Sequence, residues 1–423
     1  MLSTLRNAWK VKDLRKRILY TIFLVAIFRI GNFIPVPGID ASKLQNLNQE
    51  GSLLNFYDLM AGGAFSRFSI FALAVGPYIN ASIIMQLLTM AIPSLEQLSK
   101  EGEEGRKKIQ NITRYLAIPL SIFMAYGSYA LINSGSGAVR NPSPMSALLV
   151  IVPLVAATTF LTWLADQITV KGIGNGVSLI IFVNIISRFP TLVYQITGMK
   201  DVDVVAVALL VVISLLLLLS VIIMTLSERR IPVQYAGKAI GNKNYSGQST
   251  HIPIGMNGSA VIAIIFALSV MQFPPTIAQF FPGSGFANWV NTSTFSIFKQ
   301  NTIIYIVAYA ILVIFFTWFY SQVTFKPEEM AENMHKSAGF IPGIRPGDPT
   351  ARFIEKVLDR ISVLGGSYAA IIAVFPIILS TYTPFTGFQF GGTMLLILVS
   401  VSLDTMRQIE SQLVMRHYQG FLK

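Results

Sequence analysis

Few residues of this chain could carry out chemistry, and those few form no familiar catalytic set. The three histidines are His251, His335 and His417, and Asp166 and Asp404 stand singly near the ends of long apolar segments. The chain has no cysteine, which excludes a disulfide framework, a thiolate nucleophile and a thiolate metal site. It also lacks HExxH, G-x-S-x-G and Walker patterns. The sequence therefore predicts a protein that is not an enzyme and holds no cofactor or metal.

One glycine-rich stretch superficially resembles a phosphate-binding turn. It reads GIGNG and covers Gly172–Gly176. A phosphate-binding turn follows a β-strand, whereas this stretch follows a long apolar segment. We interpret it as a tight turn into the next apolar segment.

The composition indicates a membrane protein. Of the 423 residues, 53% are hydrophobic and only 12% are charged, whereas a soluble domain is usually about a quarter charged. Long apolar runs recur with short polar gaps. We predict ten transmembrane helices, because backbone groups in lipid must bond within their own segment. Their approximate ranges are 18–36, 69–92, 112–132, 146–166, 176–197, 203–226, 258–281, 302–324, 361–382 and 391–407.

The charges predict the orientation. Placing the N-terminus inside puts 25 of the 32 Lys and Arg residues on the inside and 6 toward the outside. This bias follows the positive-inside rule, so we expect both termini in the cytoplasm, and it accounts for most of the net charge of +12. The basic N-terminus followed by an apolar stretch is also typical of a signal peptide. Arg29 within that stretch, and the missing small-x-small cleavage site, favour a retained span instead.

Charges inside the spans are scarce. Arg29 is the one clear intramembrane charge, and all three histidines fall in inside loops or the tail. Ion-coupled transporters usually carry acidic or histidine residues at mid-membrane, so the pattern disfavours a proton relay. Arg29 either extends outward past Pro35 or pairs inside the bundle, and the sequence leaves both open.

Three connections are unusual. Ser227–Asn257 and Lys326–Lys356 are each about thirty residues, which is long for a connection without a function. They are either plain solvated loops or, as we prefer, ordered docking surfaces for a soluble partner. Outside, Gly51–Phe65 is apolar but too short to cross, so it is either an interfacial helix or a re-entrant piece that ends at Gly62-Gly63.

Ten spans allow two inverted halves of five, residues 1–200 with spans 1–5 and residues 201–423 with spans 6–10 and inside loops 227–257 and 325–360. The second and seventh spans then correspond. The second contains Gly76, Pro77, Asn80, Ser82 and Gln86, and the seventh contains the pair Pro274-Pro275. The aliphatic residues around them are, by pattern alone, ordinary packing or lipid-facing residues.

Six motifs, in order along nearly the whole chain, resemble the SecY/Sec61-alpha family of protein-conducting channels. They are FRIGNFIPVPG (28–38), SIFALAVGPYINASIIMQLL (69–88), GIGNGVSLIIF (172–182), GQSTHIPI (247–254), GFIPGIRPG (339–347) and GGTMLLI…DTMRQIESQL (391–413). The resemblance implies a translocation channel for unfolded preproteins, with an hourglass of two halves, a short re-entrant plug helix at about 53–63 and sideways release of apolar segments into lipid.

The resemblance also implies residue roles. It places a pore ring at Val75, Ile79, Val177, Ile181, Ile265 and Ile397, which reverses the packing interpretation of these six. It places the plug at Phe56, Tyr57, Leu59, Met60, Gly62 and Gly63, and the lateral gate at Gly76, Pro77, Asn80, Ser82 and Ser269. It implies partner docking at Arg229, Arg230, Lys238 and Arg345.

The implied partners are the SecE and SecG small membrane subunits, the SecA ATPase, the ribosome, preprotein signal sequences and the phospholipid bilayer. The implied location is the bacterial cell (inner) membrane. Two departures matter: family members often have proline where this chain has Ala263, and the loop after span six carries only Lys238 and Lys243 near its tip. An accessory channel paralogue with a restricted substrate set, and a solute transporter, therefore remain alternatives.

Overall fold

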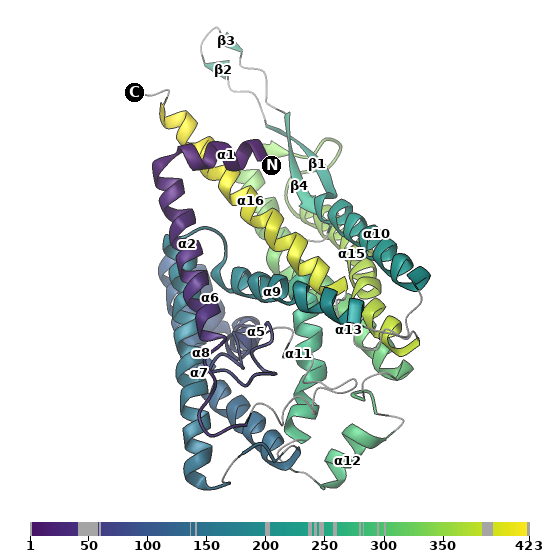
Figure 1. Cartoon of the computed structure of the whole chain (residues 1–423). Coiled ribbons are helices and arrows are strands. Elements are labelled where there is room, and N and C mark those ends of the chain that lie inside the picture. Colours follow the sequence, from purple (N-terminus) through teal and green to yellow (C-terminus); the bar gives the residue numbers. More distant parts are fainter. Residues whose placement is uncertain are drawn as a thin grey trace. The chain divides into compact units, whose positions relative to one another are not determined.

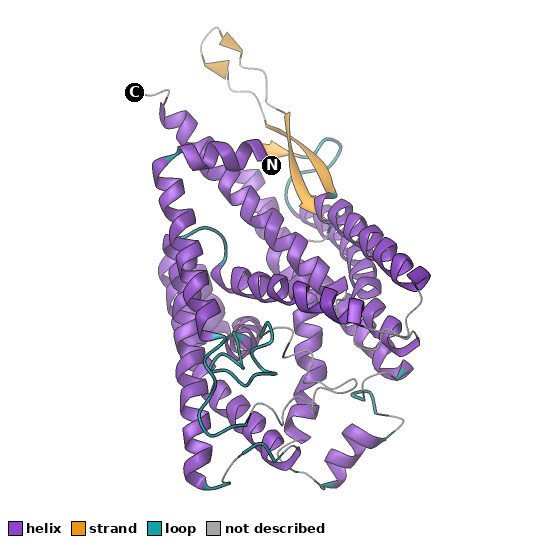
Figure 2. Ribbon diagram, viewed as in Figure 1, coloured by secondary structure: helices purple, strands orange, loops and turns teal. Residues whose placement is uncertain are grey.

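The computed structural model of the chain is shown in Figure 1. It describes all residues except 1, 41–57, 59–60, 136, 140–141, 199–203, 236–238, 241–242, 245–248, 257–259, 279–280, 282, 294–295, 300–301, 383–391 and 421–423. The described chain is mainly helical, and its strands lie only within 228–255 and 339–340 (Figure 2).

Ten long helices correspond one to one to the ten predicted spans. They are α2 (Lys12–Gly31), α5 (Gly76–Ala91), α7 (Glu103–Gly135), α8 (Pro144–Lys171), α9 (Gly176–Gly198), α10 (Val204–Leu226), α11 (Ala260–Ala278), α13 (Ile303–Phe325), α15 (Asp348–Tyr382) and α16 (Gly392–Gly420). The predicted fold class, a helical polytopic membrane protein, is confirmed.

Length and composition alone single out fewer of these helices. Within the described residues, five are long and apolar enough to cross a membrane by themselves, and a sixth span is reached if α5 and α6 (Pro93–Lys100) count as one. The axes of α5 and α6 differ by 101°. Proline at the start of α6 removes a backbone donor and permits this bend.

Three further short helices of the described chain precede or connect the long ones. They are α1 (Leu2–Lys10), α12 (Gly285–Thr292) and α14 (Pro327–Lys336). The chain divides into two compact units. Unit 1 comprises 1–201, 272–300 and 400–423, and unit 2 comprises 202–271 and 301–399, so the division falls inside α11 and α16. The predicted halves 1–200 and 201–423 stay a prediction.

In unit 1, the second span is shorter as a helix than the sequence suggested. We expected a helix over 69–92, loosened in its middle by Gly76 and Pro77, but α5 begins at Gly76 with Pro77 in its first turn. Proline suits this position because the first N–H groups of a helix have no intrahelical partner. Residues 61–75 form turns instead, bonded to the strand-like stretch after α2 through Val36 N–Phe68 O (3.0 Å) and Ile70 N–Ile34 O (2.9 Å).

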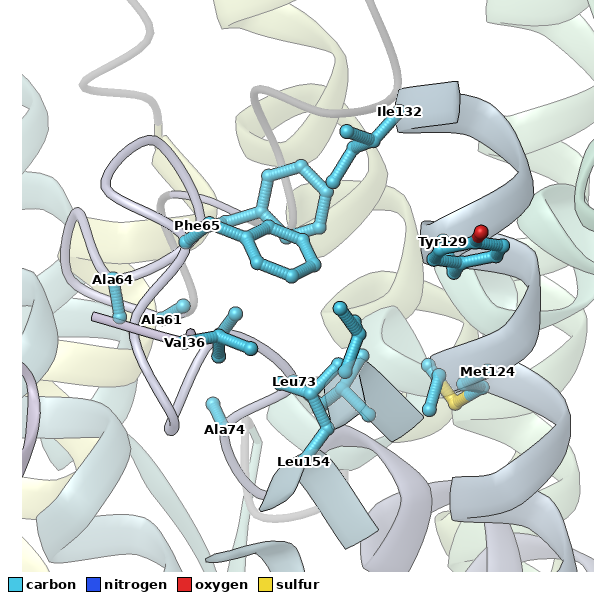
Figure 3. Packing of buried hydrophobic residues seen from close by; sticks show 14 of the residues in the cluster. Val36, Ala61, Ala64, Phe65, Leu73, Ala74, Met124, Tyr129, Ile132 and Leu154 are labelled. Atoms are coloured by element: carbon cyan, nitrogen blue, oxygen red, sulfur yellow. The ribbon is translucent and has the colours of Figure 1, made fainter. Parts of the chain in front are cut away.

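The turn segment is packed into a buried apolar cluster of unit 1. Figure 3 shows its side chains facing α7 and α8. The buried members include Val36, Ala61, Ala64, Phe65, Phe68, Leu73, Met124, Tyr129, Ile132 and Leu154. Irregular backbone is therefore enclosed by protein here, which is the condition under which it is tolerated at membrane depth.

The GIGNG stretch is a tight turn, as predicted. The hydroxyl of Thr21 on α2 accepts from Ile173 N (3.0 Å), and the Gln408 side chain accepts from Gly174 N (2.6 Å). Thr169 at the end of α8 accepts from Gly176 N (2.8 Å). The donors that a phosphate would need are therefore occupied by side chains of the same unit.

Unit 2 contains a three-stranded antiparallel sheet that the sequence analysis missed. Its order is β4 (Ser249–Gly255), β1 (Glu228–Tyr235) and β5 (Gly339–Phe340), and a separate hairpin pairs β2 (Ala239–Ile240) with β3 (Lys243–Asn244). The two long connections, 227–257 and 326–356, thus share one sheet, through Gln234↔Phe340 and Tyr235↔Gly339. Where the structure describes them, these connections form strands and helix rather than plain solvated loops.

The sheet is held on the first turns of α15 by a buried cluster. Its members are Ile231, Val233, Ile254, Met334, Ile341, Ile354, Leu358 and Ile361. Ile231 and Val233 alternate with exposed residues along β1, which is the period expected of a strand with one buried face.

Ile354→Ala should therefore loosen the sheet of unit 2. Ile354 is fully buried, so the change should reduce the free energy of unfolding by about 2–5 kcal/mol through a cavity. Thermal unfolding and limited proteolysis within 228–255 in detergent would measure this. The control is Leu364→Ala on the same helix, which is 60% exposed; equal destabilisation by both changes would contradict the packing.

Candidate functional site

Two of the six predicted ring residues lie at the start of α5. Ile79 N donates to Val75 O (3.0 Å), so the two residues are one helical turn apart on one face. Val75 is 1% exposed and Ile79 is half-buried.

Two more ring residues lie at the start of α9, directly after the GIGNG turn. Val177 is half-buried and Ile181 is buried, and they too are four residues apart on one face. The hydrogen bonds that fix the turn therefore also fix where α9 begins and in which direction it presents these side chains.

The last two ring residues belong to unit 2. Ile265 on α11 is half-buried, and Ile397 on α16 is buried. None of the six is exposed, and all are uncharged aliphatic residues in the first or middle turns of long helices. That the six share one axis stays a prediction.

Four of the five predicted gate residues lie in the first two turns of α5. On α5, Asn80 Nδ2 donates to Met124 Sδ of α7 (3.8 Å), and Gln86 Nε2 donates to Ser82 Oγ (3.5 Å) along the same helix. These bonds lie within unit 1. Gly76 and Pro77 start α5, and Ser269 is a half-buried residue of α11 in unit 2. Bonds between the gate helices stay a prediction.

The predicted plug is only partly described. Phe56, Tyr57, Leu59 and Met60 lie outside the described residues. Gly62 and Gly63 both have positive φ (+65° and +85°), and Gly63 N donates to Asp58 O (2.8 Å). A left-handed glycine with this bond is a common helix end.

Three of the four predicted docking residues are described, and they lie on or beside the sheet of unit 2. Arg229 and Arg230 are exposed on β1, and Arg230 Nε pairs with Glu228 Oε1 (2.7 Å). Lys238 lies outside the described residues. At about 3.3 Å per residue, Arg229 is about 20 Å along β1 from Tyr235, the residue that pairs with β5.

Arg345 is displayed by a rigid loop. Ile341 is 3% exposed, and both it and Ile344 pack into the cluster under the sheet. Thr350 Oγ1 donates to Arg345 O (2.8 Å). The Arg345 side chain is exposed and forms no hydrogen bond or ion pair with the described residues. A fixed backbone with a free guanidinium suits recognition of a partner carboxylate or phosphate.

Sequence reasoning missed one polar contact in unit 1. Arg29 was expected to be the one clear intramembrane charge, but Arg188 also lies within a span helix, α9, where it pairs with the buried Asp58. The sequence signal that could have predicted this pair is that Asp58 and Arg188, of opposite charge, each stand alone in an apolar segment. Arg29 Nη1 donates to Ser187 Oγ of α9 (2.9 Å), so of its two open alternatives the structure favours a partner within unit 1.

Comparisons with known proteins agree with this arrangement. The family model for SecY matches residues 69–406. Protein translocase subunit SecY of Halalkalibacterium halodurans is 42% identical over 437 residues, covering 100% of both chains. Its counterpart in Escherichia coli (strain K12) is 41% identical over 420 residues, covering 97% of this chain and 94% of that one.

Solved structures share the fold. One, described as "The structure of a protein conducting channel", has a TM-score of 0.62 at 19% identity and covers 93% of this chain and 91% of that one. Another, described as "Sec61 in the Canine ribosome-channel complex from the endoplasmic reticulum", has a TM-score of 0.60 at 19% identity, with the same coverage.

These matches favour neither the solute transporter nor the accessory paralogue that the sequence left open. The resemblance carried by the six motifs is confirmed, and the chain belongs to the SecY family of protein translocase subunits.

Proposed function

We propose that this chain lines the channel that carries unfolded preproteins across the membrane and releases apolar segments sideways into lipid. The observation that carries the proposal is that none of the six aliphatic residues is exposed: three are buried and three are half-buried, whereas many other apolar residues of the helices are exposed. The 42% sequence identity to a SecY translocase subunit over the full length of both chains supports it.

An aliphatic ring suits a pore that must pass every side chain. Polar groups at the constriction would bond some sequences and not others. Aliphatic groups form no such bonds, and a narrow apolar constriction can dewet when empty. The ring can also fit around a moving chain and so limit the leak of ions.

Sideways release needs only the composition of the passing segment. Each Leu or Ile at a helix centre gains about 0.3–0.6 kcal/mol in lipid, and each Lys or Asp costs about 2.5–3.5 kcal/mol. A twenty-residue apolar signal therefore gains on the order of 10 kcal/mol as an upper limit, and two central charges offset about half of it. Asn80, Ser82 and Ser269 would hold the gate helices with bonds that average about 0.6 kcal/mol each, weak enough to release.

The energy must come from elsewhere, since the chain has no nucleotide-binding pattern. We propose that the sheet of unit 2 docks the SecA ATPase or the ribosome through Arg229, Arg230 and Arg345, and that SecE and SecG are membrane partners. The location proposed is the bacterial cell membrane, with both termini in the cytoplasm and the sheet on that side.

Reconstituted vesicles test the function. Vesicles that hold this chain with its small subunits should accumulate a protease-protected preprotein when the ATPase and ATP are supplied. Uptake of a small solute without preprotein transport would overturn the proposal.

Ile79→Asn and Ile397→Asn should each loosen the closed constriction. A polar amide disfavours dewetting, so resting ion conductance should rise several-fold and preproteins with defective signal sequences should pass. Planar-bilayer conductance and export of such a reporter measure the two effects.

The control is Ile84→Asn on the same helix, five residues and hence about 140° around from Ile79. Equal conductance in the Ile79 and Ile84 variants would argue against the ring assignment.

Arg345→Glu should block motor-driven transport while the chain still folds and inserts. An arginine at the centre of a docking surface is worth about 2 kcal/mol or more, so transport at limiting ATPase should fall roughly 30-fold. Arg345→Lys keeps the charge but loses the planar fork and should fall less. Normal transport by the glutamate variant would refute the docking role.

A further inference from the structure

A buried carboxylate follows the predicted plug positions. Asp58 is 2% exposed. Its Oδ1 accepts from Ser66 N (2.7 Å), and its Oδ2 accepts from Ser66 Oγ and pairs with Arg188 Nη2. Both carboxylate oxygens are thus used, one of them by a cation on another element of unit 1.

The cation belongs to α9, the helix that also presents Val177 and Ile181. The Arg188 side chain is 21% exposed. Because either charge would be costly alone in this setting, the pair is favourable only while the two groups stay together.

The backbone beside Asp58 lies directly on the same face of α9. A Cβ on Gly62 would come within 2.6 Å of Asn184 Oδ1, and a Cβ on Gly63 within 3.7 Å of Arg188 Nε. Asn184 and Arg188 are one turn apart on α9. Gly62 is therefore required by close approach as well as by its positive φ, whereas Gly63 is favoured by its positive φ alone.

We call Asp58 with Ala61–Ser66 the anchored segment. Its apolar side is formed by Ala61, Ala64 and Phe65, which pack into the cluster shown in Figure 3. Its polar side is formed by Asp58 and Ser66. Apolar contacts are non-directional, so they weaken gradually as the segment moves. The hydrogen bonds and the ion pair of the Asp58 carboxylate are directional, so they do not weaken gradually.

Further polar bonds brace the same stretch of α9. Asn32 Nδ2 donates to Asn184 Oδ1 (3.3 Å), and Arg29 Nη1 donates to Ser187 Oγ. Arg188 is thus presented by a helix tied to α2 one turn before it. The guanidinium of Arg188 therefore has a fixed position, and the anchored segment is held to it through Asp58.

We propose that the Asp58–Arg188 pair is the specificity-determining contact of the channel, because it sets how strong a signal sequence must be to displace the anchored segment from α9. This inference rests on the proposed function. Release separates two charges that are stable only together, so it demands a threshold contribution from the incoming segment. A weak signal does not supply it, whereas a strong apolar signal does.

Neutral variants test the threshold. Asp58→Asn and Arg188→Gln should each raise export of a reporter with a shortened apolar signal by about tenfold or more, since breaking a buried pair is strongly destabilising. Export of the intact-signal reporter should stay near the wild-type level. The exchange Asp58→Arg with Arg188→Asp should restore part of the stringency.

The matched control is Arg114→Gln, which breaks another Arg–Asp pair of unit 1, Arg114 Nη2 to Asp166 Oδ2 (2.7 Å), between α7 and α8. It should leave stringency unchanged. Wild-type stringency in both neutral variants, or an equal rise in the Arg114 variant, would overturn the proposal. Failure of the wild-type chain to export the intact-signal reporter would instead contradict the proposed function.

A covalent replacement of the pair covers variants that fold poorly. The chain has no cysteine, so Asp58→Cys with Arg188→Cys can be bridged uniquely by a short bis-methanethiosulfonate, which forms a disulfide with each thiol and releases methanesulfinate. The bridge should stop export of the intact-signal reporter, and its reduction should restore export. Undiminished export with the bridge in place would contradict the inference.

Discussion

In a bilayer, every backbone N–H and C=O must find its partner within the protein, because lipid offers none and an unpaired group costs several kcal/mol. Within the ten long helices, most backbone groups meet this requirement through intrahelical hydrogen bonds. Two irregular stretches meet it in other ways. Residues 61–75 form hydrogen bonds to the chain after α2 and pack into the buried cluster that contains Phe65 and Leu154. The backbone N–H groups of the GIGNG turn donate to the side chains of Thr21, Thr169 and Gln408. Four of the six positions proposed to close the pore are set by these two stretches, since α5 starts where one ends and α9 where the other ends.

Polar chemistry is placed away from the proposed constriction. The six ring positions are aliphatic, whereas Asp58, Arg188 and Arg29 form polar contacts elsewhere in unit 1, and Arg229, Arg230 and Arg345 are exposed on or beside the sheet of unit 2. This division matches the task of a protein translocase. The pore must favour no sequence, the resting state must be held by something directional, and the motor must find a fixed charged surface.

The spans could be predicted because a run of about twenty apolar residues has few stable structures other than a membrane-spanning helix. The family could be assigned because six long motifs occur in order. The sheet could not be predicted in the same way: ERRIPVQY and STHIPIG are short, contain Pro232 and Pro253, and become strands only because α15 covers Ile231 and Ile254. The predicted start of the second span, residue 69, was wrong because residues 69–75 are as apolar as α5 itself, which begins at Gly76. The pairing of Asp58 with Arg188 spans 130 positions and depends on tertiary structure, so the sequence offered two isolated charges but not their contact.

The central claim, that a translocating chain passes through an aliphatic ring, is tested most directly by cross-linking in this cysteine-free protein. Cysteines introduced singly at Ile79, Ile181, Ile265 and Ile397 should each form a disulfide with a cysteine in a preprotein arrested in mid-transport. A cysteine at Leu215, which is 60% exposed on α10, should form none. Disulfides at Leu215 and their absence at the four ring positions would contradict the account.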